Sequence, residues 1–127
     1  MPTPYRGYRD LKVYQLAYSL AIELFEISKT FPPEEKYSLT DQIRRCSRSV
    51  PANIAEAWRR RKYEKAFVNK LTDSSTEEAE TEVWLDFCRD FKYFSFEKHA
   101  YFTEKCTEVA KMLAAMIDHP EKFCRRD

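Results

Sequence analysis

The chain has 127 residues, a length that suits one domain, and it is 43% hydrophobic and 34% charged. This apolar content argues against a disordered chain, and no run of 18 apolar residues is present that could span a bilayer. The 22 basic and 21 acidic side chains give a net charge of +1. The overall charge therefore predicts no partner, and only an uneven distribution of charge along the chain could do so.

The cysteines and the N-terminus indicate the compartment. No signal-peptide pattern opens the chain, and Cys46, Cys88, Cys106 and Cys124 lack the spacing of a metal site. Each cysteine lies in or beside an apolar stripe, as buried free thiols do. We therefore expect a protein of the reducing, bacterial-type cytoplasm that holds no metal and no cofactor.

The first helix is predicted over residues 11–30. It follows residues 1–10, a flexible lead-in that holds two of the six prolines and the only glycine, although Tyr5 and Tyr8 could dock on a neighbouring element. Asp10 is expected to cap the helix, and Pro32 and Pro33 to end it. The apolar stripe comprises Tyr14, Ala17, Ala21, Leu24 and Ser28, and is widened by Tyr18, Phe25 and Ile27.

The second helix begins near residue 37 and contains a proline. Its core-facing stripe has helical spacing and comprises Leu39, Ile43, Cys46, Val50, Ile54 and Ala57. Pro51 has no N–H and crowds the carbonyl of Ser47, so a kink is expected there. Two helices that meet at Pro51 are the alternative. One kinked helix is preferred, because the stripe passes through Pro51 without a change of phase.

Two more long helices follow. The third is predicted over residues 63–91, with a stripe that repeats every fourth position at Phe67, Leu71, Ser75, Ala79, Val83, Phe87 and Phe91. Between Thr72 and Glu82 its only aliphatic side chain is Ala79, so this segment packs through small groups or faces solvent. The fourth is predicted over residues 96–118, with Ser95 as its cap. Its seam is heptad-like and comprises Phe102, Cys106, Val109, Leu113 and Met116.

Together these elements predict an all-α, antiparallel up-down-up-down four-helix bundle with a kink at Pro51. The bundle is expected to be a single domain over residues 11–119, followed by a C-terminal tail over residues 120–127. Within that tail, Phe123 and Cys124 could fold back and residues 125–127 are expected to fray.

The charges are unevenly distributed. Residues 44–65 are strongly basic and residues 73–90 strongly acidic. The candidate nucleic-acid-binding residues are Arg44, Arg45, Arg48, Arg59, Arg60, Arg61 and Lys62. On a regular helix Arg44, Arg48, Arg59 and Lys62 would share one face. Either this basic strip faces a polyanion, or it pairs with the acidic third helix through Asp73, Glu77 and Glu80.

Trp58 and Tyr63 lie among the arginines. Aromatic rings in such a setting can stack nucleic-acid bases while guanidinium groups hold phosphates. Tyr, Trp and Arg are also enriched at ordinary subunit interfaces. Both interpretations stay open at this point.

The sequence offers little for catalysis. Neither His99 nor His119 is preceded by the glutamate of a di-iron Glu-x-x-His motif, and neither is paired with a serine or cysteine nucleophile. A chain with one glycine cannot build a glycine-rich phosphate loop. Glu78 and Glu82 could hold a weak divalent cation, but a solvated acidic face is the simpler interpretation. We expect no enzyme.

One block of the second helix resembles a known family. The block is similar to the two-part signature of proteins encoded in intervening sequences of bacterial 23S rRNA genes, Q-[LI]-R-R-A followed by S-[IV]-P-[AS]-N-[IV]-A-E-G. The first part corresponds to Gln42 to Cys46, and the second to Ser49, Pro51, Ala52, Asn53, Ile54, Ala55 and Glu56. Phe67, Glu80 and Glu82 resemble the F and E-x-E of the family's third helix. The chain departs from the family at Ala57 and Lys92, which stand where the family has glycine.

The resemblance implies a left-handed antiparallel bundle that assembles as a homopentamer around a central channel. Relatives serve as accessory factors of diversity-generating retroelements, in which a basic barrel binds nucleic acid and a reverse transcriptase. We therefore expect a non-enzymatic, oligomeric accessory protein that binds the RNA or DNA backbone through its basic strip. A protein-binding scaffold without nucleic-acid binding is the alternative.

Overall fold

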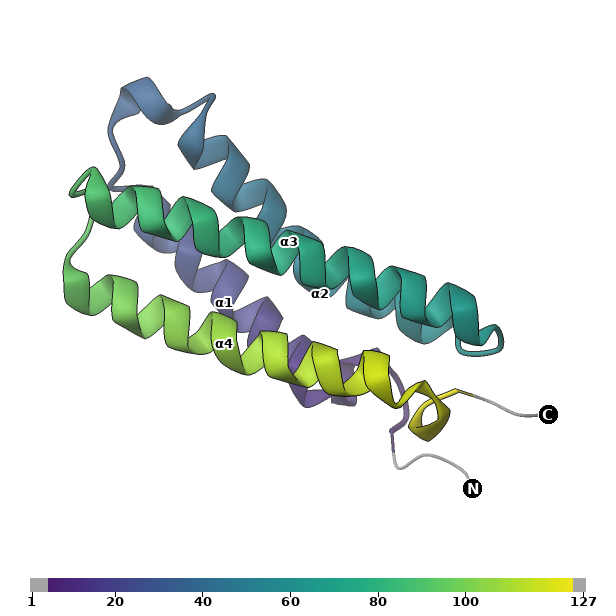
Figure 1. Ribbon diagram of the computed structural model, residues 1–127. Coiled ribbons are helices and arrows are strands. Elements are labelled where there is room, and N and C mark those ends of the chain that lie inside the picture. Colours follow the sequence, from purple (N-terminus) through teal and green to yellow (C-terminus); the bar gives the residue numbers. More distant parts are fainter. Residues whose placement is uncertain (1–4, 125–127) are drawn as a thin grey trace.

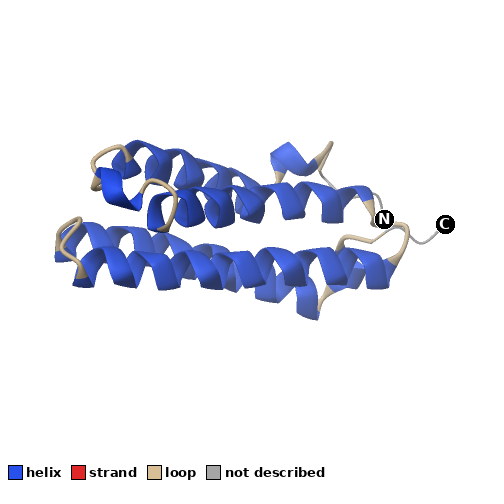
Figure 2. Cartoon of the chain, turned by 90° about the horizontal axis from the view of Figure 1, so that it is seen from above, coloured by secondary structure: helices blue, strands red, loops and turns tan. Residues whose placement is uncertain are grey.

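Four long helices form the bundle in a computed structural model, which describes residues 5–124 (Figure 1). They are α1 (Lys12–Ser28), α2 (Leu39–Arg59), α3 (Glu64–Asp90) and α4 (Phe96–Asp118). Three short 3-10 turns accompany them: η1 (Tyr8–Asp10), η2 (Pro33–Glu35) and η3 (Pro120–Lys122). Residues 5–124 contain no strand (Figure 2). The predicted all-α four-helix bundle is confirmed.

Consecutive helices pack against each other, and α4 closes the bundle by packing against α1. The helices α1 and α3 do not pack as neighbours, so they occupy diagonal positions. The start of α1 and the end of α4 lie at one end of the bundle, where the turn between α2 and α3 also lies (Figure 1). This end therefore brings together three segments that are far apart in the sequence.

Pro51 lies inside α2, which continues as one helix on both sides of it. The alternative of two helices that meet at Pro51 is therefore wrong, whereas the kink angle stays a prediction. The ring is buried and lines a groove with Tyr18, Ile22 and Phe25 of α1. Burial of this ring against α1 offsets part of the cost of the backbone hydrogen bond that a proline cannot make.

The start of α1 differs from the prediction. Asp10 belongs to η1, and its carboxylate accepts a hydrogen bond from the backbone N–H of Arg6 at 2.8 Å, so it does not cap α1. The helix begins one residue after Leu11, which is buried in the core. Tyr18, expected to widen the core stripe, is 52% exposed. Hydrophobic anchoring by Leu11, rather than a side-chain cap, fixes this helix end.

The buried face of α3 also differs from the prediction beyond its second turn. Its buried residues are Phe67, Leu71, Ser74, Glu78, Thr81, Leu85 and Cys88, at spacings that alternate between four and three. A stripe at every fourth position turns by about 40° per repeat and leaves the core face after a few turns. Val83, Phe87 and Phe91 are consequently 50%, 41% and 52% exposed. They form an apolar surface instead of core.

Two apolar clusters fill the bundle, one toward each end. The first core cluster comprises Leu11, Val13, Ala17, Val50, Ile54, Ala57, Trp58, Phe67, Leu71, Val109, Leu113 and Met116. The second core cluster comprises Leu20, Leu24, Phe31, Leu39, Ile43, Leu85, Cys88, Phe102 and Cys106. A buried polar layer of Ser47, Ser74, Glu78 and Thr81 separates them along α2 and α3. Of the two alternatives predicted for mid-α3, packing through small groups holds for Ser74 and Thr81, whereas Thr72, Thr76 and Ala79 face solvent.

The turn between α3 and α4 holds a residue in the left-handed region. Lys92 has φ 63°, and it follows the helix end in a Schellman arrangement. The N–H of Tyr93 donates to the carbonyl of Cys88 at 2.8 Å, and the N–H of Lys92 donates to that of Arg89 at 3.0 Å. Ser95 then caps α4 by accepting the N–H of Lys98 at 3.1 Å, as predicted.

Candidate nucleic-acid interface

The basic residues of the predicted strip lie in two separate places. Arg44, Arg45 and Arg48 belong to the first half of α2, whereas Arg59 ends the helix. Arg48 and Arg59 are about 16 Å apart along the axis at 1.5 Å per residue. Lys62 lies beyond the end of the helix, in the turn to α3, so it does not continue the helical face on which it was placed.

The first group packs on α1. The Nε of Arg44 donates to Oγ of Ser28 at 2.7 Å, and its guanidinium lies 4.7 Å from the centre of the Phe25 ring. The guanidinium of Arg48 lies 5.4 Å from the same ring. Arg45 is exposed, with Nη1 3.9 Å from the carboxylate of Asp41. Arg44 therefore joins α2 to α1, and Arg48 and Arg45 remain accessible.

The second group surrounds the end of α2. Arg59 and Arg60 are exposed, and Arg60 is the C-cap residue. Arg61 lies 3.7 Å from the centre of the Trp58 ring, and its Nε donates to the carbonyl of Trp58 at 2.9 Å. Positive charge at this position interacts favourably with the negative end of the helix dipole. Arg61 thus has a structural role at the helix end.

The N-terminal segment adds two arginines to this group. A groove of about 580 Å³ is lined by the basic residues Arg6, Arg9, Arg59, Arg61 and Lys62, together with Gly7, Tyr8, Asp10 and Trp58. Asp10 is the single carboxylate in the lining, and its Oδ2 already accepts the N–H of Arg6. Sequence reasoning placed residues 1–10 in the lead-in and overlooked Arg6 and Arg9. Their contribution depends on the tertiary contact between η1 and α2.

Packing between aromatic residues holds the N-terminal segment, which forms one wall of the groove, against the helices. Tyr5 contacts Trp58 edge to face, with ring centres 5.8 Å apart, and stacks on Phe123 at 6.3 Å. Tyr8 packs on Tyr14 of α1 at 5.0 Å. Phe123 folds back as predicted, because it also stacks on Phe67 at 6.3 Å. Residues 1–4 and the tail residues 125–127, including Arg125 and Arg126, lie outside the described residues.

Only one of the two aromatic candidates is accessible to a base. Trp58 is 4% exposed and belongs to the first core cluster, so its interpretation as a stacking platform is wrong. Tyr63 is 64% exposed, and the ammonium group of Lys62 lies 5.8 Å from its ring centre. The buried Trp58 instead anchors the turn on which Tyr63 and Lys62 are presented.

The structure does not show the predicted ion pairs between the basic strip and the acidic residues of α3. Across residues 5–124, Arg44, Arg48 and Arg59 form none with Asp73, Glu77 or Glu80. The ion pair between these helices has the opposite polarity, since Lys70 of α3 lies 3.6 Å from Glu56 of α2. Lys70 also lies 3.8 Å from Asp73. Within one chain, the acidic helix therefore does not neutralise these three arginines.

The residues of the family-like block stabilise α2. Ser49 Oγ donates to the carbonyl of Arg45 at 2.9 Å, and Asn53 Nδ2 donates to the carbonyl of Ser49 at 2.9 Å. Pro51 and Ile54 are buried, Gln42 and Ala55 are half-buried, and Ala52 is exposed. Glu56 forms the ion pair with Lys70. The block thus serves the packing of the helix, and it lies outside the groove.

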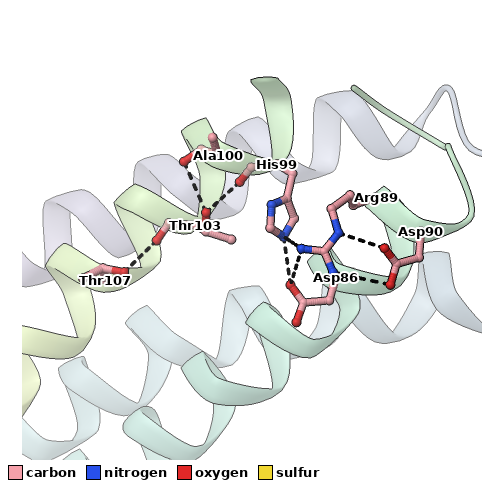
Figure 3. A network of polar contacts seen from close by, with 7 residues as sticks. All are labelled: Asp86, Arg89, Asp90, His99, Ala100, Thr103 and Thr107. Atoms are coloured by element: carbon pink, nitrogen blue, oxygen red, sulfur yellow. Dashed lines mark hydrogen bonds and ion pairs between the residues drawn. The ribbon is translucent and has the colours of Figure 1, made fainter. Parts of the chain in front are cut away.

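A second polar network joins the end of α3 to the start of α4 (Figure 3). His99 Nε2 lies 2.8 Å from Oδ1 of Asp86, and Arg89 Nε donates to Oδ1 of Asp90 at 2.8 Å. The Arg89 guanidinium holds the pKa of Asp90 below its usual value. The hydroxyl of Thr103 donates to the carbonyl of His99, so it is not aligned as a nucleophile. This network connects two helices and provides no acyl-transfer geometry.

The buried thiols are not activated. Burial raises the pKa of Cys46 to about 11 and that of Cys88 to about 12, and it also raises the pKa of Cys106. These thiols therefore stay protonated at neutral pH, and a thiol is a poor nucleophile. Among residues 5–124, no group of three or more His, Cys, Asp or Glu side chains could hold a metal ion. No helix in that range is long and apolar enough to cross a membrane.

Comparisons with known proteins agree with the resemblance seen in the sequence. A family model described as 23S rRNA-intervening sequence protein matches residues 9–115. The crystal structure of a protein with unknown function from the S23 ribosomal protein family of Bacteroides thetaiotaomicron is similar, with a TM-score of 0.75 and 29% identity. That similarity covers 83% of this chain and 97% of the other. No curated protein matches the chain. The matched range includes Arg9 and the turn after α2, but not Arg6.

Proposed function

Because the chain belongs to the family of 23S rRNA-intervening sequence proteins, we propose that it is a non-enzymatic, oligomeric accessory protein that binds the backbone of RNA or DNA. The observation that carries this proposal is the groove at the end of the bundle. Five basic residues line it against a single carboxylate, although the whole chain has a net charge of only +1. Such a local excess of positive charge favours a polyanion.

The groove favours contacts to phosphates over recognition of a sequence. Its charged donors come from arginine and lysine, which contact phosphates in any sequence. Tyr63 is the exposed aromatic residue of the adjoining turn, and it could stack an unpaired base. We therefore assign the groove residues Arg6, Arg9, Arg59 and Lys62 to phosphate binding. Arg60 extends the positive surface at this helix end, whereas Arg45 and Arg48 lie apart from it in the first half of α2.

Binding by this groove is testable with a matched pair of variants. The groove variant replaces Arg9, Arg59 and Lys62 with alanine and keeps Arg61, which is stacked on Trp58. The control variant replaces the exposed Lys36, Lys98 and Lys111 with alanine, so that the net charge changes equally. Fluorescence anisotropy with a labelled single-stranded RNA of mixed sequence, at several salt concentrations, should show binding at least about tenfold weaker for the groove variant.

The salt dependence gives a second readout of the same experiment. Each lost phosphate contact should reduce the slope of log K against log salt by about 0.7 for a single strand. The control variant should retain the slope of the unmodified protein. Equal affinities and slopes for the two variants would contradict the assignment of the groove.

Self-association is supported by two apolar surfaces of opposite charge. The basic apolar face comprises Tyr18, Ile22 and Phe25 of α1 with Arg48 of α2. The acidic aromatic face comprises Val83, Trp84, Phe87 and Phe91, beside Glu80, which accepts a hydrogen bond from Nε1 of Trp84 at 3.2 Å. The two faces belong chiefly to α1 and α3, which occupy diagonal positions in the bundle. Contact between unlike faces of successive copies is heterologous and generates a ring if it closes. The homopentamer implied by the resemblance is such a ring.

The acidic aromatic face also favours a second candidate function, a scaffold that binds another protein and no nucleic acid. Its exposed aromatic residues are typical of protein interfaces. A reverse transcriptase, the partner that the resemblance implies, is one candidate for this surface. The RNA-binding experiment separates the two functions, because a pure scaffold would bind the RNA no better than the groove variant does.

A further inference from the structure

Glu78 is the one carboxylate within the buried polar layer between the two core clusters. The residue is 4% exposed, and its Oε1 atom makes no hydrogen bond. The sequence pattern placed this residue on a solvated acidic face of α3, and the structure shows that this interpretation is wrong. A buried, unpartnered carboxylate oxygen is costly, so its protonation state matters for the fold.

A small void of about 10 Å³ adjoins Glu78 in the middle of the bundle. Ala17 and Leu20 of α1, Ser47 and Val50 of α2, Thr81 of α3, and Cys106 and Val109 of α4 line it with Glu78. All four helices therefore meet at this carboxyl group. The void shows that packing around the carboxyl group is incomplete.

Among residues 5–124, no positively charged side chain lines the void around Glu78. Three neighbouring groups can titrate: Glu82 on α3, Cys106 on α4, and Cys46 on α2, which lies next to the Cys106 thiol. The residues of α1 that line the void are apolar. The hydroxyl of Ser47 donates to the carbonyl of Arg44, and that of Thr81 donates to the carbonyl of Glu77. Both hydroxyl protons are therefore committed elsewhere. An ionised Glu78 would have no cation and neither of these hydroxyl donors, and only the weak thiol donor of Cys106 would stabilise it.

We infer that Glu78 is a proton-binding site that couples the packing of the central layer to pH. The folded bundle holds the carboxyl group neutral, with its hydrogen-bonding neighbour Glu82 one turn further along α3. Loss of the proton places a negative charge between two apolar clusters and beside a second carboxylate. The charged group can regain water only if α3 moves away from the layer, so deprotonation favours opening at this point.

The direction of the pH dependence follows from the two states. Burial raises the pKa of Glu78 from 4.5 to about 8 in the folded chain, and the hydrogen bond and negative charge of Glu82 add to this effect. The unfolded chain releases the proton near pH 4.5, whereas the folded chain keeps it up to about pH 8. The stabilising contribution is therefore complete below pH 4.5 and is lost progressively as the pH rises to about 8.

Urea unfolding of the full chain between pH 5 and pH 9 tests this inference. In the unmodified protein, the equilibrium constant for unfolding should rise by up to about tenfold per pH unit below pH 8. Glu78→Gln has the same shape and cannot ionise, so its constant should lack this rise. His99 and His119 are present in both proteins and cancel in the comparison. Glu82→Gln is the control, and it should retain most of the pH dependence because Glu78 is still buried.

Infrared spectroscopy supplies a readout that does not depend on unfolding. At pH 7 the unmodified protein should show the carbonyl stretch of a protonated carboxylic acid, which should disappear above pH 8 and be absent from Glu78→Gln. Parallel unfolding curves for the unmodified protein and Glu78→Gln would overturn the inference. So would the absence of a protonated carboxyl group at pH 7, which can be measured on the unmodified protein even if Glu78→Gln fails to fold.

Discussion

The seven basic residues of the predicted strip have different roles. Arg44 is half-buried, hydrogen-bonded to Ser28 and stacked on Phe25, so part of its hydrogen-bonding capacity is used inside the chain. Arg61 covers the Trp58 ring and donates to the Trp58 carbonyl. Arg59, Arg60 and Lys62 are exposed at the same helix end. Loss of RNA binding in a variant that removes Arg61 would therefore mix a binding effect with a structural one.

Replacement of Arg61 with alanine should destabilise the fold. The guanidinium lies 3.7 Å from the Trp58 ring centre, and a cation–π contact of this kind contributes about 0.5 to 2 kcal/mol. Chemical unfolding should show a lower midpoint for Arg61→Ala than for the unmodified protein. Arg60→Ala is the matched control, because Arg60 is exposed in the same turn. Equal midpoints for the two variants would show that the stacking contributes nothing.

At the scale of elements, most helix boundaries follow from local signals, and the start of α1 is the exception because the buried Leu11 fixes it. Proline pairs, a capping serine and the apolar spacing are all read within one or two turns, and α4 lies over the predicted residues 96–118. The buried face of α3 was predicted wrongly. Successive buried residues of a helix can be three or four positions apart, and which spacing occurs at each turn depends on the side chains of α2 and α4 that pack against it. The helix buries Glu78 and exposes Phe87, the reverse of what side-chain polarity alone indicates.

The turn after α3 contains a residue that is costly in its position. Lys92 has φ 63°, a conformation that glycine adopts without steric cost. Lys92→Gly should therefore raise the free energy of unfolding by about 0.5 to 1 kcal/mol, measured by urea titration. Lys92→Ala removes the lysine side chain beyond Cβ but keeps Cβ itself, so it should give no comparable gain in the free energy of unfolding. A gain of equal size in both variants would assign the effect to the lysine side chain instead of the backbone.

For the whole molecule, the diagonal arrangement of α1 and α3 makes a specific prediction about assembly. Ile22→Ser alters the basic apolar face, and Phe87→Ser alters the acidic aromatic face. If contacts form between unlike faces, each variant alone should be monomeric by light scattering after size-exclusion chromatography. An equimolar mixture should form a dimer, because each variant supplies the face that the other lacks.

The same experiment distinguishes other arrangements. Tyr37→Ser changes an aromatic residue that is 85% exposed and outside both faces, so it should assemble like the unmodified protein. An assembly through like faces would not be restored by mixing. A strictly monomeric unmodified protein would contradict self-association, and it would remove the avidity that several copies of the groove provide.

The sequence alone determined the number of helices, their limits to within a few residues, the family and the region in which positive charge gathers. These properties depend on residues close together in the chain, since helix ends, apolar spacing and signature motifs are local. Only the tertiary structure decided that Arg6 and Arg9 join Arg59 and Lys62, that Trp58 is covered, and that Glu78 is buried. Each of these depends on which segments meet across the bundle, and contacts between distant segments are set by the packing of all four helices together.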